Sequence, residues 1–384
     1  MTENSITRAK MNKFKFLYIF TYAPIGIICP LIGQYLDSIG FSGTQIGAVT
    51  AIGTAASIPA GLIWGKIYSE SNYGKKVIAL LCIVAACISI ICLNIHTFVL
   101  FTILYSVMFF FQGPVMGLCD AMVIEEKIPF SNIRLWGSVG YAFSVFIAGR
   151  IGQSFGLNKI FILYTAVFII AGMIALSIRE MEHHKNNLSS GNGNTEGKYF
   201  RLMHETKYIK MLLAGFFIIG ANVANNTYFG FLYRDGGGSI AGIGMAFFLM
   251  TLSEAPFMAI APKIAEKISA QKLVLLAMIV SVLRYFWFST GPSSMMLLLF
   301  FFIQGFVNGF ILVEFIKSLA KSVSDDLVGL AVPTFYSFTM GSTIICNYIG
   351  GVLLDVSGST GVYIFFTLYS LVGLAIYLIF KLYK

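Results

Sequence analysis

Long apolar runs recur along the whole chain and are separated by short polar segments. A helix needs about 20 apolar residues to cross the hydrocarbon core of a bilayer, and each run reaches that length. The pattern therefore predicts an all-α polytopic membrane protein with twelve transmembrane helices. In chain order the predicted spans are 15–36, 44–69, 77–95, 97–124, 133–155, 160–178, 208–233, 241–265, 272–290, 294–319, 327–350 and 360–381.

A polar stretch at 181–207 divides these runs into two sets of six. Its centre, NNLSSGNGNTEG at 186–197, is rich in Asn, Gly and Ser and cannot bury apolar surface. We therefore predict two six-helix bundles, 1–180 and 208–384, joined by a flexible cytoplasmic linker.

The two halves also resemble each other. Identical residues coincide when the first half is shifted by 197 positions (243 − 46), and a short polar turn leads into the next span in both halves. The matching pairs are Ile46 with Ile243, Gly47 with Gly244, Pro59 with Pro256 and Lys66 with Lys263. Because transporter repeats leave weak internal symmetry of this kind, the bundles are predicted to be pseudo-symmetric.

Composition agrees with a bilayer as the solvent. The chain is 57% hydrophobic and 11% charged, whereas soluble domains carry roughly 25% charged residues. The net charge of +9 would suit nucleic acid, but the positive residues form no single stripe, so no nucleic-acid partner is expected. Membrane lipid is the expected surrounding.

The positive residues also predict the topology. Of the 26 Lys and Arg, only Arg150, Lys159 and Arg234 fall in predicted outside segments, while Arg134 and Arg284 lie within spans. Under the positive-inside rule this places both termini in the cytoplasm of a multi-pass protein of the cell membrane. The polar start shows no cleavage site, so the first span is predicted to be retained.

Sequence motifs for enzymes and cofactors are missing. There is no GxxxxGK[ST], HExxH or nucleophile elbow, so no cofactor is expected and the chain is predicted not to be an enzyme. The six cysteines lie in apolar runs without any CxxC, and we interpret them as small hydrophobic residues.

A few ionisable residues fall within the predicted spans, where each costs about 3 kcal/mol or more. Asp120 lies near the end of the fourth span and Arg134 opens the fifth, so we predict that both bind solute. Glu254 is followed by the helix-interrupting Pro256, and Arg284 is flanked by aromatic residues. Glu254 is predicted to carry a proton and Arg284 to tune its proton affinity.

Other readings of these charges stay open, since each could snorkel or form a structural ion pair. The structural reading is favoured for Glu314 and Lys317, near an inner end. None of the four histidines lies in a span, so a carboxylate would have to carry any coupled proton.

Amide side chains form a second polar patch. In the seventh span Asn222, Asn225 and Asn226 are three and four residues apart and share one helical face. We predict that Asn222 and Asn226, with Gln304 of the tenth span, hydrogen-bond a solute. Hydrogen bonds between helices are the alternative.

Twelve spans in two related sets resemble the major facilitator superfamily. GKIYSESNYGKK (65–76) is similar to that superfamily's loop between spans two and three, and GGVLLDVSG (350–358) to a related loop signature. IRLWGSVGY (133–141) and VSVLRYFW (280–287) resemble segments of the lactose permease and phenylpropionate permease branch of proton symporters.

The resemblance to this branch implies roles for individual residues. It implies that Arg134 pairs with Asp120 and binds substrate, that Tyr141 stacks on substrate, and that Arg284 lies near the proton-coupling acid, here Glu254. In the tenth span Gln304 and Val307 stand where lactose permease has His and Glu, so coupling through that His is not expected.

Together these features predict a secondary active transporter that moves a small polar organic solute by alternating access, with proton symport. The solute would be a sugar, nucleoside or aromatic acid, and the protein a monomer. Two alternatives stay open: proton-driven efflux of sugars or drugs, and a non-transporting membrane sensor or scaffold.

Overall fold

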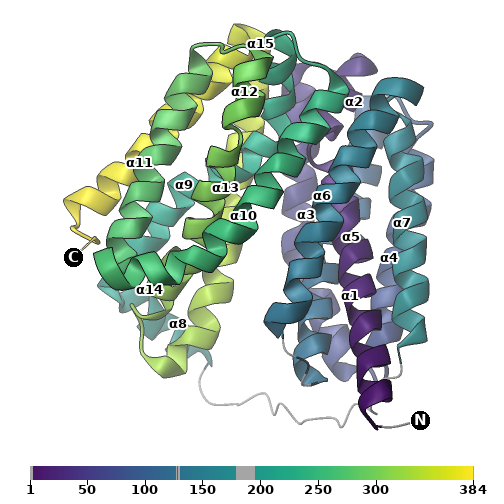
Figure 1. Ribbon diagram of the computed structural model, residues 1–384, viewed down its shortest axis with the longest axis horizontal. Helices are drawn as coiled ribbons and strands as arrows, with labels where there is room; N and C mark the ends of the chain where they lie inside the picture. The colour runs from purple at the N-terminus through teal and green to yellow at the C-terminus, as the bar shows by residue number, and fades with distance from the viewer. Residues whose placement is uncertain (1–2, 127, 129, 179–194, 384) are drawn as a thin grey trace. The chain divides into compact units, whose positions relative to one another are not determined.

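The computed structural model describes residues 3–126, 128, 130–178 and 195–383, and in these residues the chain forms helices and no strand (Figure 1). In chain order the helices are α1 (Glu3–Ile28), α2 (Ile32–Ser38), α3 (Gly43–Glu70), α4 (Gly74–Cys92), α5 (Phe98–Glu125), α6 (Phe130–Phe155), α7 (Lys159–Ser177), α8 (Thr195–His204), α9 (Thr206–Asp235), α10 (Ile240–Ile268), α11 (Ala270–Ser289), α12 (Ser294–Phe300), α13 (Phe302–Phe310), η1 (Ile311–Phe315), α14 (Ile316–Ala320) and α15 (Asp325–Ile379).

The helices are long enough for the predicted twelve crossings. Ten segments of the described chain have the length and hydropathy of a membrane span. One of them, Leu327–Ile379, has 53 residues and turns at Gly358, whose φ of 64° lies in the left-handed region that glycine tolerates. Dividing α15 there and adding the 26-residue α6 gives twelve, which confirms the predicted fold class.

Two departures from the expected helices are visible. The predicted linker falls mainly on residues outside the described part of the chain, but its last portion forms α8, which the sequence analysis did not foresee. The predicted span 294–319 is divided into α12, α13, η1 and α14, and η1 is a π-helical turn. Single π turns are frequent at functional sites.

The described helices form two compact units. Unit 1 comprises Met1–Phe41, Ala48–Asn187 and Ser239–Phe248, and unit 2 comprises Ser42–Gly47, Leu188–Gly238 and Leu249–Lys384. The first turn of α3 therefore belongs to unit 2 although the rest of α3 belongs to unit 1. The reverse holds for α10, whose start packs within unit 1. Gly47 and Gly244, which the internal repeat pairs, both lie in these reassigned helix starts.

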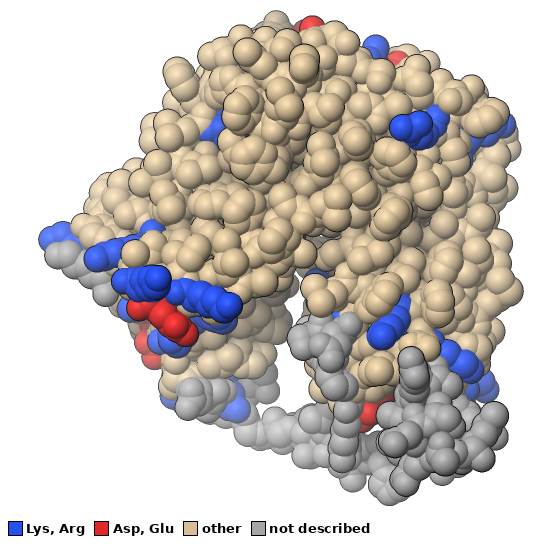
Figure 2. Space-filling model, viewed as in Figure 1, with Lys and Arg blue, Asp and Glu red and all other residues tan. Residues whose placement is uncertain are grey.

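Side-chain burial fits a protein surrounded by lipid. Large apolar side chains lie on the outside, among them Leu62 (78% exposed), Phe155 (71%) and Ile379 (72%). On the face drawn in Figure 2, charged residues lie toward the ends of the helices and leave a broad uncharged surface between them. An apolar surface of this extent is not stable in water, which agrees with the multi-pass membrane fold.

Candidate functional site

Unit 1 holds an ion pair that joins three helices. Arg134 Nη1 on α6 lies 3.2 Å from Asp120 Oδ2 on α5. The hydroxyl of Tyr18, on α1, donates a 2.6 Å hydrogen bond to the other carboxylate oxygen, Oδ1. The side chains of Asp120 and Arg134 are 28% and 43% exposed, so the pair remains accessible to a solute. The structure thus brings together the two charges that the sequence singled out.

Glycines in the fifth span allow this arrangement. A Cβ on Gly137 would lie 2.9 Å from the ring of Tyr22, and one on Gly140 would lie 2.7 Å from the Cα of Ile19. Because both positions lack a side chain, α6 approaches the backbone of α1 closely. The guanidinium of Arg134 then lies over the ring of Tyr22, 4.9 Å from its centroid, which is within cation–π range.

Tyr141 lies two helical turns beyond Arg134, on the same side of α6. It is half-buried, and its carbonyl accepts a 2.9 Å hydrogen bond from the Ser144 hydroxyl, which also contacts the carbonyl of Ala23 on α1. These bonds tie the Tyr141 backbone to α1. Stacking of its ring on a solute stays a prediction.

In unit 2 the side-chain amide of Asn222 joins four other residues. Its Oδ1 accepts hydrogen bonds from Gln304 Nε2 (2.9 Å), Arg284 Nη2 (3.2 Å) and the Tyr285 hydroxyl (3.4 Å). Its Nδ2 donates to Asn308 Oδ1 at 2.6 Å. We call these five residues, from α9, α11 and α13, the Asn222 cluster. Asn222 and Gln304 thus meet, as expected for members of one site.

The Asn222 cluster has hydrogen-bonding capacity to spare. Arg284 is only 4% exposed, yet its Nε and Nη1 have no hydrogen-bond partner, and Gln304 Oε1 is also unsatisfied. A buried guanidinium with two unused donors costs free energy unless another group binds it. The cluster can therefore donate to and accept from the hydroxyl, carbonyl or amide groups of a solute.

Arg284 contacts side chains of α9 and α11. Arg284 donates a hydrogen bond to Asn222 and interacts with the Tyr285 side chain, and its guanidinium lies over the rings of Tyr285 and Phe288. The role of Arg284 in tuning the proton affinity of Glu254 stays a prediction. Spacing along the sequence could not reveal that Arg284 bonds Asn222, because this contact depends on how α9 packs against α11.

The three asparagines of the seventh span have different surroundings. Asn225 is fully buried and accepts a 2.8 Å hydrogen bond from the Tyr363 hydroxyl on α15. This contact matches the alternative of a bond between helices. Asn226 is half-buried and lies outside the Asn222 cluster, so its binding of solute remains a prediction.

Two acids of unit 2 lie in different settings. Glu254 is half-buried on α10, where Gly305 and Gly309 of α13 allow close packing: Cβ atoms there would lie 2.9 Å from Glu254 N and 3.2 Å from its carbonyl oxygen. Glu314 is 2% exposed in the π turn and pairs with Lys317 Nζ at 3.1 Å. Glu314 thus forms the structural ion pair with Lys317 that the sequence analysis favoured.

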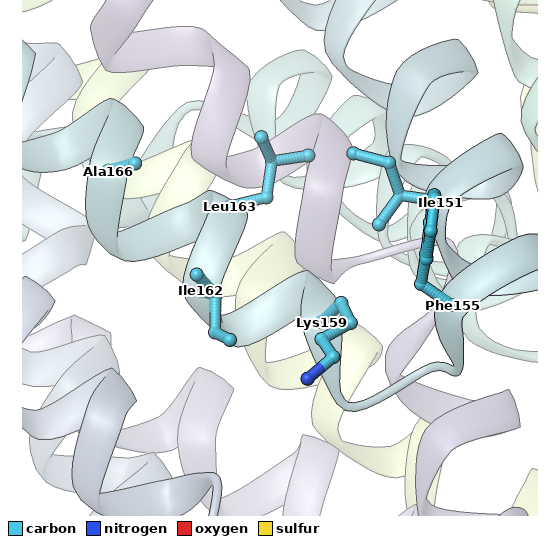
Figure 3. A pocket seen from close by; sticks show the side chains of 6 residues that line it. All are labelled: Ile151, Phe155, Lys159, Ile162, Leu163 and Ala166. Carbon is cyan, nitrogen blue, oxygen red and sulfur yellow. The ribbon is translucent and has the colours of Figure 1, made fainter.

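An open groove in unit 1 holds none of the predicted site residues. Its volume is about 410 Å³, and Figure 3 shows its lining from α6 and α7. The lining residues are Ile151, Phe155, Lys159, Ile162, Leu163 and Ala166. The lining is almost wholly apolar, so it suits lipid chains better than a polar solute. Among the described residues, no cluster of His, Cys, Asp and Glu is suited to a metal ion.

Comparison with known proteins agrees with this architecture. The MFS_1 like family matches residues 11–365, which is most of the chain. The chain belongs to this family. It is therefore a major facilitator superfamily transporter, a multi-pass membrane protein whose fold serves secondary transport.

Two similar proteins match over nearly the whole length of both chains, and a third matches over a shorter part. The chain is 26% identical to the uncharacterized transporter YwbF of Bacillus subtilis (strain 168), over 96% of this chain and 93% of that protein. It is 25% identical to the maltose permease of Geobacillus stearothermophilus, over 97% and 94%. A probable 3-phenylpropionic acid transporter of Escherichia coli (strain K12) is 23% identical over 70% and 71%.

Solved structures share the fold of this family member. The nucleoside transporter NupG superposes with a TM-score of 0.82 at 18% identity, covering 97% of this chain and 99% of that one. A D-xylose-proton symporter superposes with a TM-score of 0.75 at 12% identity, covering 98% of each chain. At these identities the likeness concerns the fold alone.

Proposed function

We propose that this transporter imports a sugar or nucleoside together with protons by alternating access. The observation that carries the proposal is the Asn222 cluster, in which a half-buried amide gathers Arg284 and Gln304 and leaves donors and an acceptor unused. Sugars and nucleosides offer many hydroxyl groups, each able to donate and accept. The names of the maltose permease, NupG and the D-xylose-proton symporter support this solute class.

Each unit has its own candidate contacts for solute. In unit 1, Asp120 accepts from solute hydroxyl groups while Arg134 and Tyr18 keep the carboxylate oriented. In unit 2, Arg284 donates and Gln304 accepts. Tyr141 and Asn226 complete the proposed solute contacts.

Proton coupling is assigned to Glu254. It is a half-buried acid of a predicted span. Arg284 tunes its proton affinity in this proposal and, because it also bonds Asn222, takes part in solute binding as well. Protonation would neutralise the Glu254 carboxylate before the loaded carrier changes conformation, which lowers the cost of moving it through an apolar surrounding. Both termini are placed in the cytoplasm on the positive-inside rule.

Transport by the purified protein in liposomes tests the proposal. Counterflow of radiolabelled maltose, D-xylose, uridine and 3-phenylpropionate would identify the solute class, since counterflow needs no proton gradient. We expect a sugar or the nucleoside to exchange, and an inward proton gradient to drive its accumulation. Exchange of 3-phenylpropionate alone would reassign the unused donors of Arg284 to a carboxylate.

The same assay separates the alternatives. Accumulation driven only by a gradient in the efflux direction would replace import by efflux. The folded protein is offered a broad panel of sugars, nucleosides, drugs and aromatic acids. If it exchanges none of them, the result would support the non-transporting sensor or scaffold. Asn222→Ala should abolish exchange. Gln112→Ala, which removes an amide that bonds Tyr164 in unit 1, should preserve exchange.

A further inference from the structure

The two exchanged helix starts carry unequal contacts. At α3, a capping box joins Ser42 and Gln45: the Ser42 hydroxyl oxygen accepts from Gln45 N (3.2 Å), and Gln45 Oε1 accepts from Ser42 N (3.0 Å). The next two amides, of Gly43 and Thr44, donate to the carboxylate of Asp355 on α15, at 2.6 and 2.7 Å. All these residues belong to unit 2.

The Thr44 hydroxyl adds a third bond to Asp355, at 2.6 Å. The carboxylate thus accepts three short hydrogen bonds at the positive end of a 28-residue helix. Hydrogen bonds to an ionised acceptor are about twice as strong as neutral ones, and a negative charge at a helix N-terminus gains further from the helix dipole. Asp355 is exposed, so solvent screens part of this gain, but three bonds to a carboxylate still exceed a single bond to a neutral acceptor.

The equivalent contact at α10 is weaker. Ser239 occupies the position of Ser42, and its hydroxyl accepts from Gly242 N at 3.1 Å, but Gly242 cannot return the bond that Gln45 makes. Here Gln153 of α6 takes the place of Asp355, and its neutral Oε1 accepts one bond, from Ile240 N at 3.0 Å. The two repeats therefore differ: the start of α3 binds a charged acceptor, Asp355, whereas the start of α10 binds a neutral one, Gln153.

Glycines hold both starts at the closest approach. A Cβ on Gly47 would lie 2.5 Å from Asn347 O, and a Cβ on Gly244 would lie 2.6 Å from Val145 O. Neither site admits a side chain without moving the backbone. The two contacts differ in charge and number of bonds rather than in tightness of packing.

Motion of the units must either bend α3 and α10 or break these contacts. α3 is one continuous helix whose first turn belongs to unit 2 and whose remainder, from Ala48, belongs to unit 1. If unit 1 moves relative to unit 2 during alternating access, α3 must bend near Gly47 or leave Asp355. The same choice applies to α10 and Gln153.

We propose that Asp355 is the main latch of the transport cycle. It holds the start of α3 on α15, and its release limits the rate at which the transporter opens. The Gln153 contact at the start of α10 is weaker and does not limit opening. Asp355 touches no solute and acts by positioning α3. The link to transport rests on the proposed function, whereas the strength of the latch does not.

Hydrogen–deuterium exchange of the purified full-length protein, without solute, measures the latch directly. Asp355→Asn should speed exchange of the peptide that covers residues 43–47 by about tenfold, because a charged acceptor becomes neutral. Asp355→Glu should restore much of the protection. Gln153→Glu should slow exchange at 240–244, since it adds the missing charge to the weaker contact.

Two results would overturn the latch: exchange at 43–47 within twofold of wild type in Asp355→Asn, or equal acceleration at 240–244, which would mean general loosening. If Asp355→Asn does not fold, Thr44→Val removes one of the three bonds and should give a smaller acceleration at 43–47. No acceleration there would equally count against the latch.

Counterflow then tests the role in transport. We expect Asp355→Asn to raise the exchange rate of solute severalfold, because release of the contact limits opening, and Gln153→Glu to lower it. Unchanged rates in both would refute the role in the cycle. A protein that shows the predicted deuterium exchange but moves no solute would uphold the latch contact and refute the proposed transport function.

Discussion

Neutralising Asp120 tests whether the Asp120–Arg134 ion pair binds solute or only stabilises the fold. Asp120→Asn leaves the side-chain shape unchanged but removes the charge 3.2 Å from Arg134 Nη1 and weakens the 2.6 Å bond from Tyr18. Because Asp120 and Arg134 are 28% and 43% exposed, solvent screens the pair, and its loss should cost about 1 kcal/mol or less of folding stability.

The expected effect on transport is larger. If a solute hydroxyl group binds the carboxylate, one charge-assisted hydrogen bond is lost, which contributes about 1.5–3 kcal/mol. Since 1.4 kcal/mol corresponds to tenfold in affinity, the apparent KM in counterflow should rise by about 10- to 100-fold. The thermal unfolding midpoint should fall by only a few degrees.

A double-mutant cycle completes the test with Arg134→Gln and the double variant Asp120→Asn, Arg134→Gln. KM values, measured over a wide range of solute concentration, give the coupling energy for transport, and unfolding midpoints give it for stability. The reasoning is refuted if all three variants keep the wild-type KM. It is also refuted if transport falls only in proportion to the fraction unfolded.

Three further predictions concern other parts of the chain. Asn222→Ala removes the acceptor of the 3.2 Å hydrogen bond from Arg284 and should lower the unfolding stability by about 2–4 kcal/mol while abolishing counterflow; normal counterflow would contradict the assigned site. Glu254→Gln should lose accumulation driven by a proton gradient but keep counterflow, whereas Glu314→Gln should keep both; the reverse result would move the proton site to the π turn. Gly140→Leu should prevent folding or cost at least about 3 kcal/mol, because its side chain meets the backbone of α1; a stably folded variant, by thermal unfolding, would show that α1 and α6 can separate.

The membrane spans could be predicted from the sequence because bilayer thickness imposes a length on every apolar run. The meeting of Asp120 with Arg134 was also within reach, since only a short turn separates their spans. Tyr18 gave no signal: the chain contains 19 tyrosines, and nothing in its neighbours marks the one that bonds Asp120.

Contacts between helices that lie far apart along the chain could not be predicted from the sequence. Asn222 and Arg284 are 62 residues apart, and their hydrogen bond depends on how α9 and α11 pack. Likewise, the repeat at Gly47 and Gly244 predicted symmetry but not that each helix start joins the opposite unit. Helical periodicity describes one face of one helix and carries no information on its neighbour.

The exchanged starts of α3 and α10 also bear on how the chain is built during synthesis. Unit 1 includes Ser239–Phe248, so the first half of the chain cannot complete its own packing until residue 248 has left the ribosome. Unit 2 in turn needs Ser42–Gly47, which is made near the beginning. Domains usually fold one after the other from the N-terminus. Here neither half is finished alone, so two separately expressed halves should be unstable apart and recover when produced together.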